Sequence, residues 1–458
     1  MLKPFPIFTV LAALFAIHLS ACGNSEYPEA SGWDDIIETW DSEENDQDDD
    51  TSHYSQSSSS KEFQYLPIDD SKYPYAGIPR IVIVTENYRK IKDRETEIPA
   101  KLQIWGKKAP DSEIMDLTIK GRGNSSWYAM PKNSYKIEFV NKQEMLGMPK
   151  NRDWALIANY ADKTLMKNYL MYNLSAKLGA YYTPRCEFVE LYLNKEYLGV
   201  YLLTETIKIG KNRINIPQTS NSFIVEIDVI HLREGQQAVY SDIIDPVEDN
   251  EKGTPFHILS PKNASEQDLS TIKEHIRSFE KFLVQKSDSV KNFKKWIDVN
   301  EYIKHYWIQE FSKNPDANFR TSVFFSWVKD DIIKMGPVWD FDLAIGGYPD
   351  TAKASPTGWY IKRFYWNKYI FKDSVMKSKV KTFWEKNRNI FYDTNLLIDS
   401  TATFLQRAAD NNFKRWKVLQ STENRYHTKS FKDYNEAINN TKKWFNKRFN
   451  WIDNQLKD

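Results

Sequence analysis

The residues with the clearest chemical potential lie in a short acidic segment near residue 340. Asp340 and Asp342 alternate within Trp339-Asp340-Phe341-Asp342. If this segment is extended, both carboxylates point to one face, where their mutual repulsion favours a bound cation. Carboxylate oxygens suit Mg²⁺ and allow it to bridge phosphate groups. A turn in which both aspartates cap backbone groups is the alternative interpretation.

A further aspartate precedes this pair in the segment Lys313-Asn314-Pro315-Asp316. In protein kinases, one aspartate accepts the proton of the substrate hydroxyl and a later aspartate holds Mg²⁺. Asp316 and Asp340 follow the same order along the chain. Asp316 is therefore the candidate general base.

A glycine-rich segment, residues 121–127, offers a place for an anion. It contains Arg122-Gly123-Asn124-Ser125 directly after a predicted strand, and the backbone N–H groups of such a turn can hold phosphate oxygens. An ordinary turn explains the same residues. Lys132 and Lys136 follow shortly afterwards and could pair with phosphate, although strand lysines are commonly only solvated.

Glu205 ends an apolar run in Leu202-Leu203-Thr204-Glu205. Its carboxylate could anchor a catalytic lysine, or it could simply lie at the solvated end of a strand. The residues around it do not decide between these two roles.

The elements that position these residues divide into two kinds along the chain. Alternating or β-branched segments bounded by Pro, Gly or Asn predict strands in the first half, at residues 81–85, 101–105, 116–120, 134–139, 188–193, 197–203 and 223–228. One helix is predicted at 165–178. Helical periodicity dominates beyond about residue 260, at residues 268–286, 299–313, 371–391, 396–420 and 434–456. A strand pair at 322–328 and 332–335 interrupts these helices, so we expect an α+β, two-lobed protein with a strand-rich N-terminal half and a helical C-terminal half.

The N-terminus predicts export and lipid attachment. Residues 1–21 contain one early cation and an apolar run, which is typical of a signal peptide, and Leu19-Ser20-Ala21-Cys22 has the lipobox pattern of bacterial lipoproteins. We expect lipidation at Cys22, which would anchor the chain in the cell envelope outside the cytoplasm, at the outer membrane or cell surface. Residues 22–62 are rich in acidic residues and serine, which predicts a disordered tether. The remaining residues, 63–458, form the predicted folded domain.

Composition excludes some classes of partner and of chemistry. The net charge is +1, so no basic field favours nucleic acid. Cys186 is the only cysteine beyond Cys22. It lies in an apolar strand, where a small buried side chain is the simpler interpretation than a nucleophile.

Together, these motifs resemble the CotH kinase family of spore-coat type, in its lipoprotein branch. The resemblance covers roughly residues 80–455 and keeps the motif order of the family. It rests on the segments at 122–127, 131–136, 158–163, 166–168, 191–194, 197–205, 313–316 and 336–342.

The resemblance implies an atypical protein-kinase-like fold that uses ATP and Mg²⁺ or Mn²⁺ to phosphorylate Ser/Thr of secreted or surface proteins. It implies that Lys132, or alternatively Lys136, holds the ATP phosphates and that Glu205 anchors this lysine. Asp316 would be the base. The residues that would hold the metal are Asp340, Asp342, Asn314 and Ser322. The chain departs from many members at Asn133, Glu138 and Lys167, so the choice between the two lysines stays open.

Two other functions fit the same sequence. The chain is 14% aromatic, and the cluster between Trp359 and Tyr369 could stack on sugars, which would suit an adhesin that contacts protein or polysaccharide. Such clusters also form core packing. A metal-dependent hydrolase that uses the carboxylates is the third hypothesis.

Overall fold

The computed structural model describes residue 68 and residues 70–457, except 108, 232–234, 247–250, 286–291, 349–350 and 423–427. Cys22, the predicted signal peptide and the predicted tether up to residue 62 lie outside the described residues. Within the described part, no helix is long and apolar enough to span a membrane.

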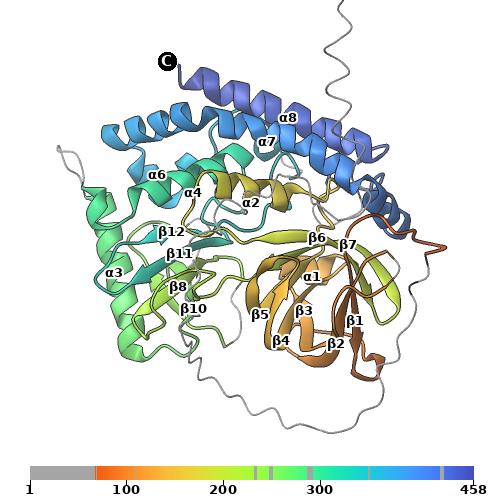
Figure 1. The fold of residues 1–458 in the computed structure, drawn as a ribbon. Helices are drawn as coiled ribbons and strands as arrows, with labels where there is room; N and C mark the ends of the chain where they lie inside the picture. The colour runs from red at the N-terminus through yellow and green to blue at the C-terminus, as the bar shows by residue number, and fades with distance from the viewer. Residues whose placement is uncertain are drawn as a thin grey trace, which may run out of the picture. The chain divides into compact units, whose positions relative to one another are not determined.

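Seven strands of the first half form a closed barrel (Figure 1). They are β1 (Arg80–Thr85), β2 (Ile98–Trp105), β3 (Met115–Arg122), β4 (Ser134–Met145), β5 (Met148–Ile157), β6 (Cys186–Leu193) and β7 (Glu196–Glu205). The barrel closes because β1 pairs in parallel with β6, with Ile81 opposite Leu191. Alternate side chains fill its interior with apolar groups such as Ile83, Ile137 and Trp154.

A second sheet has five strands in the order β12-β11-β8-β10-β9. They are β8 (Ser222–Ile227), β9 (Ala238–Ser241), β10 (Thr254–Ser260), β11 (Val323–Val328) and β12 (Lys334–Met335). The pairing of β8 with β11 brings together two segments that lie far apart in the sequence, with Ile227 opposite Val323.

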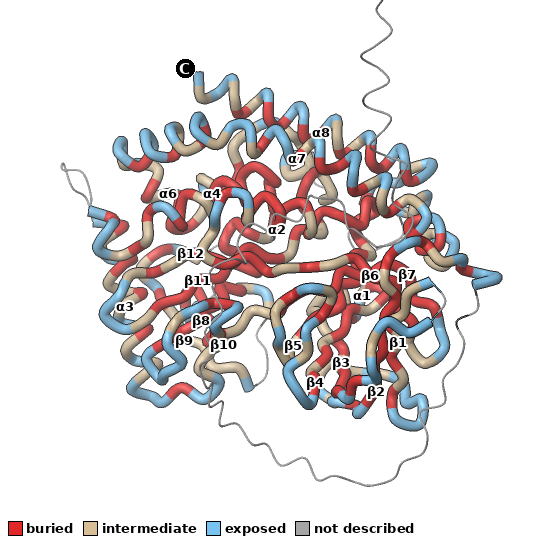
Figure 2. Tube along the Cα trace, viewed as in Figure 1, coloured by how far each residue is buried: buried red, intermediate tan, exposed pale blue. Residues whose placement is uncertain are grey.

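The helices are mostly in the second half of the chain. They are α1 (Ser125–Ala129), α2 (Lys167–Lys177), α3 (Glu266–Val284), α4 (Val299–Ser312), α5 (Thr351–Ala354), α6 (Tyr365–Ile370), α7 (Ser374–Arg415) and α8 (Tyr434–Gln455). Helices α7 and α8 pack along each other. Helices α2 and α4 are buried over most of their length, as Figure 2 shows.

The α+β class is confirmed, and so is the strand pair inserted among the helices. The two helices predicted at 371–391 and 396–420 are one helix, α7, because no Gly or Pro interrupts the sequence between them. Strands β5, β9 and β10 were not predicted from the sequence, nor was the closure of the barrel.

Candidate active site

Two asparagines from separate parts of the chain hold the acidic segment in place. Asn314, just after α4, donates to the Asp340 carbonyl (2.9 Å). Asn168, in the first turn of α2, accepts from the Phe341 N–H (2.8 Å) and donates to Asp342 Oδ1 (2.5 Å). The segment is not extended, because Asp340 has a left-handed φ of 61°. The condition of an extended segment is therefore not met, and the two asparagines fix the aspartates instead.

Asn168 is itself oriented by the loop that precedes α2. Its side chain donates to Asn159 Oδ1 (3.1 Å), and Asn159 donates to the Leu165 carbonyl (3.0 Å). Asp162 accepts from the backbone N–H groups of Thr164 and Lys167. The polar motifs at 158–163 and 166–168 thus build the support for Asp342, a role that sequence reasoning did not assign to them.

The three aspartates interact electrostatically, although Asp316 comes from a different loop than Asp340 and Asp342. Burial and the nearby charge of Asp340 raise the pKa of Asp316 to about 7, against a smaller opposing effect of Arg320. Burial also raises the pKa of Asp340, and burial together with the charge of Asp340 raises that of Asp342. The structure therefore brings Asp316, Asp340 and Asp342 into one site in which ionised carboxylates are disfavoured.

Asn314 and Ser322, the other predicted metal ligands, flank Asp316. Asn314 Oδ1 accepts from the Asp316 N–H (3.2 Å). The backbone N–H of Thr321 donates to the Asp316 carbonyl (3.1 Å), which places Ser322 directly after the loop around Asp316. Asn314 thus positions both Asp316 and Asp340 through hydrogen bonds.

The glycine-rich segment reaches the same site through Arg122. Its guanidinium lies 4.8 Å from the centre of the Trp339 ring, and its charge lowers the pKa of Asp340. Gly123 has a φ of 106°. Arg94 holds this loop in place by donating to the Gly123 carbonyl and to Asn124 Oδ1 (2.8 Å each). Arg122 is thus a cation that this loop supplies to the acidic site.

Lys132 does not have the surroundings of a phosphate ligand. Its side chain is buried, and its ammonium donates to the Ala158 carbonyl (2.8 Å), the Val200 carbonyl (2.5 Å) and Asn412 Oδ1 (2.9 Å). An ammonium group has three hydrogens, so these contacts occupy all of them. In this structure Lys132 joins the barrel to α7, and its role in holding ATP phosphates stays a prediction.

Lys136 and Glu205 belong to a charge network on the barrel. Lys136 forms ion pairs with Asp153 (2.8 Å) and Glu138 (3.0 Å). Glu205 is fully buried and accepts from Arg185 Nε (3.0 Å) and from Arg213. The carboxylate predicted to anchor a lysine therefore anchors two arginines, and the acids that hold Lys136 are Asp153 and Glu138.

Sequence reasoning missed Asp228 and His231, which follow β8. Asp228 is 1% exposed, and its Oδ1 accepts from the backbone N–H groups of Ile230 and His231 (2.9 Å each). The charges of Asp228 and His231 act on both Asp316 and Asp340. The available signal was an aspartate at the end of a predicted apolar strand.

The donor set fits a hard divalent cation that is shared with a ligand. Among the described residues, no three His, Cys, Asp or Glu side chains form a complete metal cage. Mg²⁺ usually binds one or two carboxylates and completes its shell with phosphate and water. Asp340 and Asp342 supply such a pair, and burial raises the pKa of both carboxyl groups.

Most of the chain matches a known protein family. The model of the CotH kinase protein family matches residues 119–452, from within β3 to within α8. The chain belongs to the CotH kinase family. The CotH match contains every residue of the acidic site described above, whereas β1 and β2 precede it. No curated protein matches the chain.

Proposed function

We propose that this CotH family member transfers the γ-phosphoryl group of ATP to Ser/Thr hydroxyls of secreted or surface proteins. The observation that supports this most is the electrostatic coupling of Asp316 to Asp340 and Asp342, which a separate loop carries. A kinase-like, two-lobed arrangement would place this site between the barrel and the part built from the second sheet and the helices.

Each residue of the acidic site would have a separate role in phosphoryl transfer. Asp340 and Asp342 would hold Mg²⁺ or Mn²⁺, which supplies charge neutralisation for the phosphates when bound. Arg122, rather than Lys132 or Lys136, would pair with phosphate oxygens, because its guanidinium already lies at Trp339 beside the carboxylates. Asp316 would accept the proton of the substrate hydroxyl. Its pKa of about 7 suits a base that works near neutral pH.

The proposal also includes the location of the protein in the cell envelope. Lipidation of Cys22 would anchor the chain in the cell envelope, and the acidic segment up to residue 62 would tether the domain. The protein substrate would then be one that is exported to the same surface. Metabolic labelling with a palmitate analogue, lost in Cys22→Ala, tests this part separately.

The test of catalysis is transfer of labelled γ-phosphate from Mg-ATP or Mn-ATP to the protein itself or to a casein-like acceptor. Asp316→Asn and Asp340→Ala should each lower the rate by roughly 10³-fold or more. Glu187→Gln is the matched control, since burial also raises the pKa of this acid, to about 8, in β6. Equal labelling by wild type and Asp340→Ala, or none by either, would defeat the kinase proposal.

The alternative of an adhesin has less support. The aromatic cluster that could have stacked on sugars is largely internal: Trp366 is fully buried against Phe256 and Phe325, and Tyr365 donates to Glu280 (2.6 Å). A pure binding module should show no thermal stabilisation by Mg-ATP, so a nucleotide-independent melting temperature would favour it.

A further inference from the structure

A chain of three side chains links α1 to the loop after β8. Ser125 Oγ lies 3.2 Å from His231 Nε2. On the other side of the ring, His231 Nδ1 lies 3.0 Å from Asp228 Oδ2 and 3.2 Å from Oδ1. Ser125 and His231 are partly exposed, whereas Asp228 is buried.

The surroundings of Asp228 decide how this chain is protonated. The backbone N–H groups of Ile230 and His231 donate to its carboxylate, which favours the ionised form. An ionised carboxylate only accepts hydrogen bonds, so His231 Nδ1 must carry the hydrogen of that contact. In the neutral ring, Nε2 then has a free lone pair directed at the Ser125 hydroxyl, which becomes the donor.

We infer that Ser125 is an activated nucleophile, with His231 as its general base and Asp228 as the residue that orients the imidazole, in a second activity that hydrolyses carboxylic esters. Such triads are recognised on unrelated folds by two features. These are the order serine, histidine, buried aspartate and the two contact distances between them. This activity needs neither nucleotide nor metal and so stands apart from the proposed kinase activity.

The reaction balances with water as the only co-reactant. Ser125 Oγ forms a bond to the ester carbonyl carbon while its proton moves to His231 Nε2. The carbon–oxygen bond to the alcohol breaks, and the alcohol leaves with the proton from the imidazolium. Water then attacks the acyl-serine and gives its proton to His231. The carboxylic acid is released, and Ser125 Oγ takes the proton back.

The charges around Ser125 favour an uncharged ester over an anionic substrate. Asp228, Asp316 and Asp340 interact with one another at this place, and their negative charge repels a phosphate ester when no metal is bound. Arg122 lies three positions before Ser125 on the same segment. Its guanidinium lies over the Trp339 ring, and its charge acts on Asp340.

The first test uses a tagged alkyl fluorophosphonate, which labels activated serines, on the full mature chain in EDTA without ATP. Wild type should be labelled at Ser125, as mapped by mass spectrometry, and Ser125→Ala should lose all labelling. Ser126→Ala, the neighbouring serine of α1, is the matched control and should be labelled at the wild-type rate. His231→Gln should react roughly 10³-fold more slowly while its melting temperature stays close to that of wild type.

The second test uses p-nitrophenyl acetate hydrolysis and addresses Asp228. Asp228→Asn should lower kcat and leave KM unchanged, because the amide no longer fixes the tautomer of His231. Unlabelled wild type, label that persists in Ser125→Ala, or equal rates for wild type and His231→Gln would each overturn the inference. In those cases the three side chains only tie α1 to β8. Because none of these assays uses ATP, their outcome is independent of the kinase test.

Discussion

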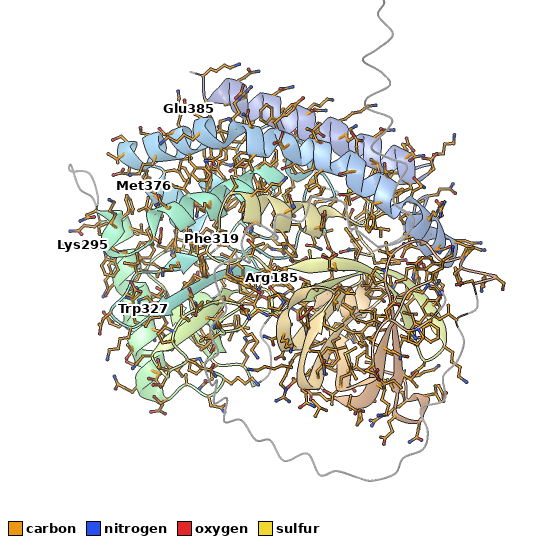
Figure 3. The ribbon with its side chains drawn as sticks, viewed as in Figure 1. Arg185, Lys295, Phe319, Trp327, Met376 and Glu385 are labelled. Carbon is orange, nitrogen blue, oxygen red and sulfur yellow. The ribbon has the colours of Figure 1, made fainter. Side chains whose placement is uncertain are left out.

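Glu205 is fully buried and Asp340 is partly buried, and the groups that surround these two carboxylates differ. Glu205 accepts hydrogen bonds from Arg185, Arg213 and Tyr182; Figure 3 labels Arg185, which directly precedes β6. Burial instead raises the pKa values of Asp316, Asp340 and Asp342. The charge of Asp340 raises those of Asp316 and Asp342 further.

This difference indicates that Glu205 serves the stability of the fold and that the aspartates around Asp340 serve function. A buried carboxylate that is matched by guanidinium groups holds the fold together, and its removal leaves uncompensated positive charge. A group of carboxylates without full compensation costs stability and is retained where chemistry requires it. The following predictions test this distinction, beginning with the largest effect.

Loss of the Glu205 carboxylate should have the largest effect on stability. Glu205→Gln leaves Arg213 and Arg185 without their buried counter-charge, so we expect a loss of about 3–5 kcal/mol in the free energy of unfolding. Urea denaturation at pH 7 measures it. A loss below about 1 kcal/mol would show that the Glu205 network is not structural.

Lys132 should behave as part of the fold and not of the nucleotide site. Lys132→Met leaves the carbonyls of Ala158 and Val200 without their donor, at a cost of up to about 3 kcal/mol in the free energy of unfolding. In the fraction that remains folded, the KM for Mg-ATP should stay within about two-fold of wild type. A much larger rise in KM with unchanged stability would return Lys132 to the role that the family resemblance implies.

Asp153 should add stability that depends on pH. Burial raises the pKa of Asp153, but the charges of Lys136 and Lys208 outweigh this effect and lower the pKa to about 2. The folded pKa is below the unfolded one, so this stabilisation is present above about pH 4 and disappears as the pH falls through about 2. Asp153→Asn should therefore cost ~2 kcal/mol at pH 7 and progressively less in acid.

The exposed pair Lys101–Asp116 provides the control for this experiment. Asp116→Asn should change the free energy of unfolding by less than about 1 kcal/mol. If both variants lose the same amount, burial does not distinguish the two ion pairs.

Asp316 should show the opposite dependence of stability on pH. Its folded pKa of about 7 lies above the unfolded value, so the stability associated with its protonated form is complete below about pH 4 and is lost as the pH rises through about 7. In EDTA at pH 8, Asp316→Asn should therefore have a higher free energy of unfolding than wild type, because the amide has no carboxylate to ionise. A less stable variant at pH 8 would mean that the carboxylate is compensated after all.

The sequence predicted local elements better than long-range closure. Alternation identified β1, β3 and β4, because each strand has one face in the barrel core. The parallel pairing of β1 with β6 depends on contacts between segments about a hundred residues apart, which no local pattern encodes. The local pattern likewise did not show that the two predicted helices form one helix, α7.

The same limit applies to the site. The motif order pointed to Asp316, Asp340 and Asp342, which the structure brings together. The acceptors around Lys132 come from Ala158, Val200 and Asn412, so its burial could not be read from its own motif. His231 lies on a loop without periodicity, and only the fold places it between Ser125 and Asp228.

The most direct test of the central claim is a crystal structure grown with Mn²⁺ and a non-hydrolysable ATP analogue, with data collected at a wavelength where manganese scatters anomalously. The account predicts an anomalous peak within coordination distance of Asp340 and Asp342, with the phosphates of the analogue near Arg122. A nucleotide bound through Lys132, or a manganese peak remote from both aspartates, would contradict it.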